Sequence, residues 1–122
     1  MNQPENRHHA INYIEFAATD IAAAKKFFSS VFGWNFTDYG PDYASFSANT
    51  AGVDGGFYNA EPHEPHSKTA PLVVIYSADL AATEAAVLAA GGKVVVSTFE
   101  FPGGRRFHFA DGVGNVLAVW SE

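Results

Sequence analysis

Four side chains with the potential for chemistry alternate with apolar residues along two stretches of the chain. Glu15 lies two residues after Tyr13, and His108 lies two residues after Arg106. Because residues two apart in a β-strand point to the same face, each pair is predicted to share one face of a sheet. A carboxylate in such a place needs a partner if it is buried, so Glu15 is interpreted as a general base, a ligand anchor or one member of a structural pair.

The second pair suits proton transfer or the binding of an anion. Arg106 would pair with Glu15 or hold an anionic ligand through two parallel hydrogen bonds. His108 would serve as an acid or a base near neutral pH. The competing interpretation is a strand whose polar face meets solvent, and the residues alone leave both open.

Metal ligands would have to be histidines or carboxylates, because the chain has no cysteine. His63 and His66 have the spacing of a metal pair, but a proline-bearing segment is more typical of a solvated loop. His8 and His9 are adjacent, and successive side chains of an extended chain point apart. The segment 111–115 is predicted to be a tight turn rather than a calcium loop.

The charge balance excludes some partners. The formal net charge is −6, with only seven Lys and Arg residues, which disfavours nucleic acids and anionic membranes. No apolar run approaches the roughly 20 residues of a membrane span, and no secretory signal is evident. We therefore expect one domain over residues 1–122 and a cytoplasmic location. Aromatic residues make up 15% of the chain, which predicts either ring-rich cores or an aromatic-lined cavity.

The elements that position these residues are repeated in the sequence. Residues 12–33 align with residues 71–92 at a constant offset of 59, which places Asp20 on Asp79 and Gly33 on Gly92. Aspartate is a favoured helix N-cap and glycine a favoured C-terminal cap. The repeat predicts two copies of one supersecondary unit.

Each copy is predicted to fold as βαβββ. The first module spans residues 10–60, the linker 61–70 and the second module 71–121. The first predicted helix has its N-cap at Thr19 or Asp20 and runs to about Phe32. The second runs from its cap at Asp79 to about Ala90, with Leu88 facing inward. The predicted strands are 11–17, 34–39, 43–47, 53–58, 71–76, 93–97, 105–110 and 116–120, with turns at 49–52 and 101–104. The pair Gly55 and Gly56 indicates a bulge or a close approach of backbone.

The order of these elements resembles the vicinal oxygen chelate superfamily, the glyoxalase, bleomycin-resistance and extradiol dioxygenase group. The resemblance is carried by Asp20 before a helix with a Phe-Phe pair, by FGW at 32–34, and by F-x-D-G-x-G-N at 109–115 before a strand ending in AVW. It implies an α+β fold in which paired βαβββ modules form a cupped mixed sheet. It also implies a ligand site inside the cup and, often, a homodimer.

The same resemblance places the metal ligands of the family on four positions. The first-strand histidines fall on Tyr13 and Leu72, and the last-strand carboxylates fall on Ala118 and near Gly56 or Phe57. None of these is a good ligand for a hard divalent ion. We therefore expect no metal and no other cofactor.

The favoured hypothesis is a metal-independent protein that binds a small apolar or aromatic molecule in the cup between the modules. One alternative is a divalent-metal glyoxalase-like lyase or dioxygenase with rearranged ligands drawn from Glu15, His108 or His9. Another is a non-enzymatic module that binds a protein partner. The predicted lining residues are Tyr13, Glu15, Leu72, Val74, Tyr76, Arg106, His108, Ala118 and Trp120, of which Glu15 and His108 are the catalytic candidates.

Overall fold

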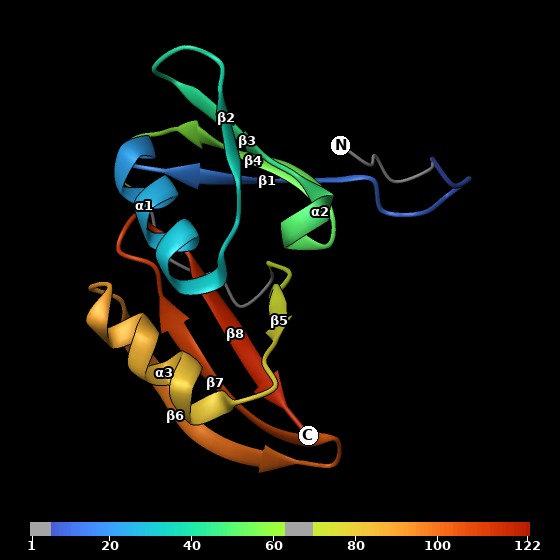
Figure 1. Ribbon diagram of the computed structural model, residues 1–122, viewed down its shortest axis with the longest axis vertical. Coiled ribbons are helices and arrows are strands. Elements are labelled where there is room, and N and C mark those ends of the chain that lie inside the picture. The colour runs from blue at the N-terminus through green and yellow to red at the C-terminus, as the bar shows by residue number, and fades with distance from the viewer. Residues whose placement is uncertain (1–5, 63–69) are drawn as a thin grey trace. The chain divides into compact units, whose positions relative to one another are not determined.

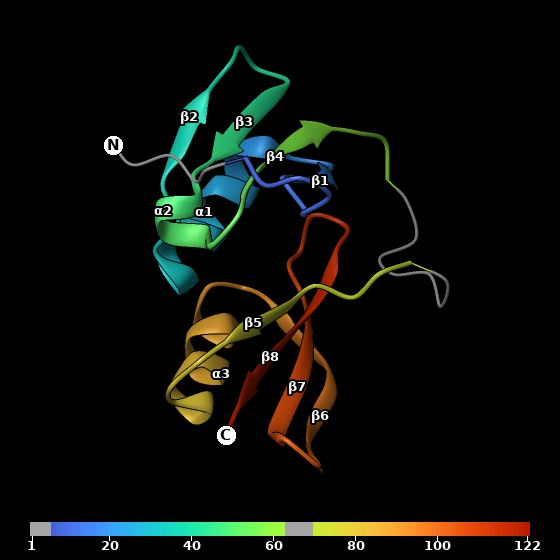
Figure 2. The ribbon, with the colours of Figure 1, turned by 90° about the vertical axis from the view of Figure 1, so that its right-hand side faces the viewer.

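A computed structural model describes residues 6–62 and 70–122 (Figures 1 and 2). Contacts divide the chain into two compact units, residues 1–62 and 63–122. Within the described residues, no helix is long and apolar enough to cross a bilayer.

The first unit is a four-stranded sheet with one long helix. Its elements are β1 (Tyr13–Ala18), α1 (Ile21–Phe32), β2 (Phe36–Asp38), β3 (Tyr43–Phe46), α2 (Ala48–Ala51) and β4 (Asp54–Asn59). The strand order is β1-β4-β3-β2. The β1–β4 pair is parallel and the other pairs are antiparallel, so the sheet is mixed.

The second unit repeats this architecture. Its elements are β5 (Val74–Tyr76), α3 (Leu80–Ala89), β6 (Lys93–Phe101), β7 (Gly104–Ala110) and β8 (Val116–Ser121). The strand order β5-β8-β7-β6 is the first sheet's order shifted by four, and the β5–β8 pair is again parallel. The predicted α+β fold of two βαβββ modules is confirmed.

The helix caps also repeat. Asp20 accepts a hydrogen bond from the Ala23 amide and Asp79 from the Ala82 amide, both at 3.1 Å. Each satisfies an amide that the first turn of a helix leaves without a partner. At the other end of α1, Gly33 has φ of 73°, a left-handed conformation that glycine adopts without a side-chain clash.

Aromatic rings fill the core between α1 and the first sheet. Phe28 is fully buried, and its ring centroid lies 4.9 Å from that of Trp34 and 5.2 Å from that of Phe57. Phe16 stacks on Phe57 at 5.2 Å. The prediction that Phe16 faces the helix is therefore confirmed.

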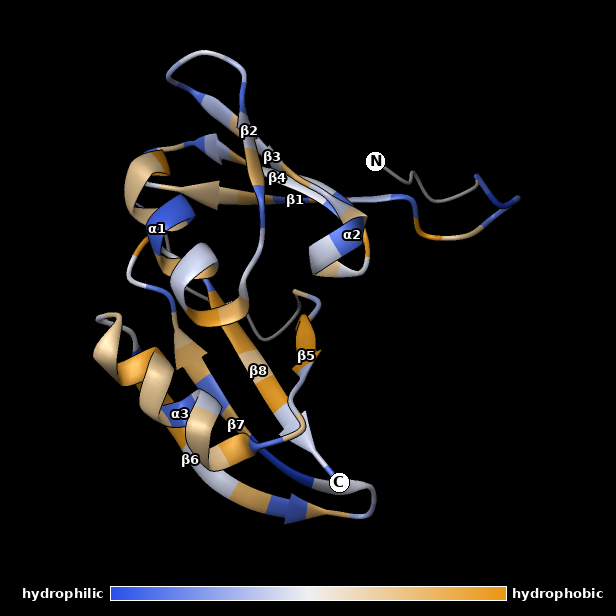
Figure 3. Ribbon diagram, in the orientation of Figure 1, coloured by the Kyte–Doolittle hydropathy of each residue, from blue (hydrophilic) through white to orange (hydrophobic). Residues whose placement is uncertain are grey.

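The second core uses the buried face of β7 and β8. Phe107, Phe109, Leu117 and Val119 are all fully buried, and Figure 3 shows β8 as apolar along most of its length. The prediction that Leu88 faces inward is wrong, because its side chain is 53% exposed. A helix turns by about 100° per residue, which carries Leu88 about 80° away from the buried Leu80.

Several boundaries differ from the sequence-based prediction; β1 begins at Tyr13 instead of residue 11, and β5 begins at Val74 instead of residue 71. Residues 48–51 form the single-turn helix α2, capped by the Ser47 hydroxyl on the Asn49 amide, instead of an open turn. Strand β2 is only three residues long, and Trp34, predicted to be part of it, is a buried core residue before it. Strand β6 continues to Phe101 instead of ending at residue 97, with two register shifts along its pairing with β7.

Gly55 and Gly56 mark a close approach of the chain, not a bulge. The β1–β4 register is continuous across both glycines. A Cβ atom at Gly55 would overlap the Ile14 carbonyl oxygen and the Phe46 ring. A Cβ atom at Gly56 would overlap the Tyr43 hydroxyl. The close-approach alternative of the prediction is therefore confirmed.

Asp111 organises the turn before β8, as predicted. Its carboxylate accepts hydrogen bonds from the Val113 and Asn115 amides at 2.9 Å and from the Asn115 side chain at 3.0 Å. Burial raises the pKa of Asp111 above its ordinary value, and these hydrogen bonds oppose the rise. No cation is needed to explain this turn.

Replacing Asp111 with alanine is expected to lower the free energy of unfolding by about 1–2 kcal/mol. The substitution leaves the Val113 amide and the partly buried Asn115 amide without their acceptor. Urea denaturation followed by circular dichroism measures the change. A stability equal to that of the wild type would show that water replaces the carboxylate without cost.

Candidate functional site

The face of the first sheet opposite α1 carries polar side chains. Strand register aligns Glu15, Gly56, Ser45 and Thr37 in one row across β1, β4, β3 and β2. Since Gly56 has no side chain, the row is open at its centre. The Tyr43 ring, from the neighbouring row, fills this opening.

A hydrogen-bonded chain connects two tyrosines to a carboxylate on this face. The Tyr43 hydroxyl donates to Glu15 Oε2 at 2.9 Å and lies 2.5 Å from the Tyr13 hydroxyl. Tyr43 has a single hydroxyl proton, which it gives to Glu15, so Tyr13 must be the donor to Tyr43. Glu15 is exposed, so the partner that a buried carboxylate would need is not required, although Glu15 accepts the hydrogen bond from Tyr43.

The Tyr43 hydroxyl has a perturbed acidity. The pKa of Tyr43 is raised above its ordinary value of 10.0. Partial burial is the largest cause, and the hydrogen bonds with Tyr13 and Glu15 are the next largest. The folded protein therefore keeps this proton to a higher pH than the unfolded chain does. The stabilisation that results is complete below pH 10.0 and is lost as the pH rises through the folded-state pKa.

Replacing Gly56 with alanine is expected to lower the pKa of Tyr43 towards its ordinary value. The added methyl group displaces the Tyr43 hydroxyl and breaks the chain to Glu15. Ultraviolet absorbance of phenolate measures the titration, with Tyr43→Phe in each background to isolate the Tyr43 signal. Identical titrations with and without the methyl group would contradict the assigned chain.

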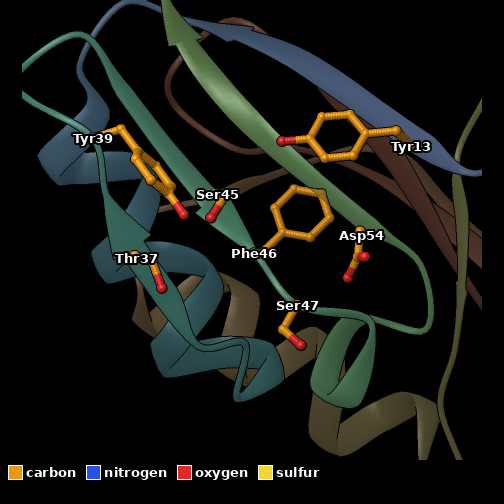
Figure 4. Close-up of a pocket in the computed structure, with 7 residues that line it drawn as sticks. All are labelled: Tyr13, Thr37, Tyr39, Ser45, Phe46, Ser47 and Asp54. Carbon is orange, nitrogen blue, oxygen red and sulfur yellow. The ribbon is translucent and has the colours of Figure 1, made fainter. Parts of the chain in front are cut away.

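A cavity of about 400 Å³ opens beside the hydrogen-bonded Tyr13, Tyr43 and Glu15 side chains (Figure 4). Its volume is within the size range of small-molecule sites. Its lining residues are Tyr13, Thr37, Tyr39, Ser45, Phe46, Ser47 and Asp54. Asp54 lies next to Tyr13 in register, and its Oδ1 accepts a hydrogen bond from the Ala48 amide at 2.7 Å. The cavity thus combines rings, hydroxyls and one carboxylate.

The face of the second sheet opposite the buried Phe107 and Phe109 is aromatic. Register aligns Tyr76, Trp120, Arg106 and Phe99 in one row across β5, β8, β7 and β6. The ring centroids of Tyr76 and Trp120 are 5.1 Å apart in an edge-to-face arrangement. Ala118 pairs with His108 and Val74 in the next row.

The guanidinium group of Arg106 lies over two aromatic rings. Its guanidinium carbon lies 5.2 Å from the centroid of Phe99 and 5.5 Å from that of Phe101. Its Nε atom is buried, and within residues 6–62 and 70–122 it has no hydrogen-bond acceptor. A mostly apolar pocket of about 290 Å³ lies here, lined by Val74, Phe101, Gly103, Arg106 and Trp120.

The structure distributes the predicted lining residues over both units. Tyr13 lines the cavity of the first unit and Glu15 lies on the same sheet face. Val74, Arg106 and Trp120 meet at one pocket of the second unit. Tyr76, His108 and Ala118 share the second sheet's face. Leu72, predicted to lie in the first strand of the second module, precedes β5 and belongs to no strand.

Of the remaining histidine candidates, His8 and His9 are not among the residues that line these two pockets. His63 and His66 lie outside the described residues. The rings of His8 and His9 stack at 3.8 Å, so the prediction that they point apart is wrong. The left-handed φ of 67° at His9 replaces the extended chain on which that prediction depended.

Several site residues escaped prediction from sequence. Tyr43 and Asp54 begin strands, and only the register brings them beside Glu15 and Tyr13. The sequence pattern predicts a turn at Phe101, yet this residue belongs to β6 and its ring lies under the Arg106 guanidinium. The sequence signal that Tyr43 faces away from the helix is its alternation with the apolar Ala44, which the structure buries.

The residues at the family's metal positions do not fit a hard divalent ion. The Tyr13 hydroxyl is hydrogen-bonded to the Tyr43 hydroxyl, Gly56 has no side chain, and the side chain of Ala118 is a methyl group. Across the described part of the chain, no three His, Asp or Glu side chains gather where an ion would bind. Metal independence itself stays a prediction.

The fold and these sheet faces define a member of a known superfamily. The sequence matches the glyoxalase/bleomycin resistance protein/dioxygenase superfamily over residues 10–119. The chain belongs to this superfamily, as the resemblance implied.

Individual curated relatives share about 30% of their aligned residues with this chain. The putative glyoxylase CFP32 of Mycobacterium bovis is 29% identical over 124 residues, which cover 95% of this chain and 47% of the relative. The anthracycline biosynthesis protein DnrV of Streptomyces peucetius is 31% identical over 126 residues, which cover 90% and 46%. The chain thus spans about half the length of the curated relatives it matches.

Solved structures support the fold. A glyoxalase-related enzyme from Fulvimarina pelagi superposes with a TM-score of 0.76 at 18% identity, covering 93% of this chain and 88% of that one. The FosX fosfomycin resistance protein of Listeria monocytogenes gives the same TM-score at 13% identity, covering 95% of each chain.

Proposed function

We propose that this chain binds a small aromatic molecule carrying an anionic group, and that it does so without a metal ion. The observation that carries the proposal is Arg106, with its guanidinium stacked on rings at an apolar pocket. Pockets of this kind bind small organic ligands through apolar walls and a few polar groups that fix orientation. Arg106 is such a group.

The chemistry of Arg106 defines the ligand class. A buried N–H without an acceptor is costly, and a carboxylate or phosphonate that accepts from the guanidinium relieves that cost. The rings of Phe101 and Trp120, which line the same pocket, favour a planar ring on the ligand. One relative is named an anthracycline biosynthesis protein, which is consistent with a ligand built from rings.

Metal independence is supported by the poor donors at the family's ligand positions. A lyase or dioxygenase with rearranged ligands remains the alternative, with Glu15 and His108 as the catalytic candidates. Metal analysis of protein purified without chelator distinguishes the two. A stoichiometric Ni, Zn, Fe or Mn ion bound through Glu15 or His108 would overturn the proposal.

We also propose that the chain forms a homodimer and acts in the cytoplasm. The homodimer proposal is supported by the superfamily to which the chain belongs, in which dimers are common. Light scattering at micromolar concentration tests the first proposal. A monomer under these conditions would contradict it.

The ligand proposal is tested by calorimetric titration with 2-naphthoate and its neutral counterpart 2-naphthalenemethanol. Because both present the same rings, the difference in affinity isolates the anionic group. We expect the carboxylate to bind more tightly, with amide shifts of the ¹⁵N-labelled protein on β7 and β8. Equal affinity, or shifts confined to the first unit, would overturn the assignment to Arg106.

A further inference from the structure

We propose that the cavity of the first unit is a second binding site, one that takes an organic ammonium group attached to a small ring. This inference is independent of the ligand proposed for Arg106, since the residues that line the cavity all belong to the first unit. The cavity walls provide a carboxylate, hydroxyl acceptors and aromatic faces. Together these are the groups that recognise an organic cation.

Asp54 supplies the charge. It is the one acidic residue among the seven that line the cavity, and none of the seven is basic. Its Oδ1 is fixed by the Ala48 amide at 2.7 Å, which orients the carboxylate at the start of β4. An ammonium group that reaches Oδ2 would make a charge-assisted hydrogen bond, the stronger kind.

Tyr13 supplies a directed acceptor. The Tyr13 hydroxyl donates its hydrogen bond to the Tyr43 oxygen, because the Tyr43 hydroxyl donates its own to Glu15. The Tyr13 oxygen therefore meets a ligand as an acceptor and prefers a donor such as an N–H group. Since Tyr13 and Asp54 are register neighbours, both acceptors are presented on the same part of the sheet.

Aromatic faces complete the site. Figure 4 shows the rings of Tyr13 and Tyr39 among the lining side chains, and both rings are exposed, whereas the Phe46 ring is almost fully buried. A cation near the face of such rings gains attraction from their quadrupoles. No Lys or Arg is among the seven lining residues, and the chain's formal net charge is −6, so repulsion of a cation is absent from these walls.

The test titrates the ¹⁵N-labelled full chain with phenethylammonium, using 2-phenylethanol and 3-phenylpropionate as neutral and anionic counterparts. We expect amide shifts on β1 to β4 and an affinity at least about tenfold above that of either counterpart, the size of one charge-assisted hydrogen bond. Equal affinities, or shifts only in the second unit, would overturn the proposal.

Two matched variants remove one negative charge each from the first unit. Asp54→Asn keeps the oxygen that the Ala48 amide needs and is expected to weaken phenethylammonium binding at least about tenfold. Asp38→Asn removes a carboxylate that instead pairs with Lys25 of α1 at 2.7 Å, and we expect less than about a twofold change. If both variants weakened phenethylammonium binding equally, the effect would come from the net charge of the protein, and the proposed binding site at Asp54 would be wrong.

Discussion

Replacing Gly55 with alanine is expected to lower the free energy of unfolding by about 3 kcal/mol, at the upper end of the cost of overpacking. The new methyl group would overlap the Ile14 carbonyl oxygen and the Phe46 ring. Ile14 is the direct partner of Gly55 in the β1–β4 pair, so relief requires the two strands to separate. Urea denaturation followed by far-ultraviolet circular dichroism measures the loss.

The neighbouring glycine provides the matched control. At Gly56 the atoms closest to an added methyl group belong to the end of the Tyr43 side chain, which can rotate away, although the Ala44 carbonyl oxygen would lie 2.9 Å from that methyl group. We therefore expect Gly56→Ala to cost about 1 kcal/mol. Equal losses for the two variants would show that side-chain freedom does not decide the cost.

Replacing Arg106 with glutamine is expected to weaken the binding of 2-naphthoate about 30-fold, or roughly 2 kcal/mol, the value of a charged hydrogen-bonding partner. Glutamine keeps a polar stem beside Phe99 and Phe101 but has neither the charge nor the fork of donors. Calorimetry measures the dissociation constant, and urea denaturation confirms that the variant is folded.

Two further measurements separate charge from packing at this position. Arg106→Lys retains the charge but lacks the planar stacking of a guanidinium, so we expect an intermediate affinity. The neutral 2-naphthalenemethanol should bind the wild type and Arg106→Gln almost equally. A 30-fold loss for the neutral compound as well would show that Arg106 acts through packing alone.

The duplicated fold could be predicted because its signals are local. Asp20 and Asp79 start helices through their own side chains, and Gly33 ends one through its own backbone. The two faces of β1 follow from strict alternation, which needs no knowledge of the partner strand. These features depend on neighbours within a few residues.

The candidate site could be predicted only in part. The contacts of Tyr43 with Glu15 and of Phe101 with Arg106 depend on strand register, which the sequence does not reveal. Tyr43 reaches Glu15 only where β3 and β4 place it beside a glycine. Phe101 reaches Arg106 only because β6 runs past residue 97, and its register shifts give no periodic signal in the sequence. Long-range pairing, not residue type, creates these contacts.

The proposed function is tested most directly by titrating 2-naphthoate into protein treated with EDTA and into the same protein supplied with Ni²⁺, Zn²⁺, Fe²⁺ or Mn²⁺. The described residues that line the Arg106 pocket include no metal ligand, so we expect the same dissociation constant in every case. Binding that disappears with EDTA and returns with one of these ions would contradict the metal-independent function.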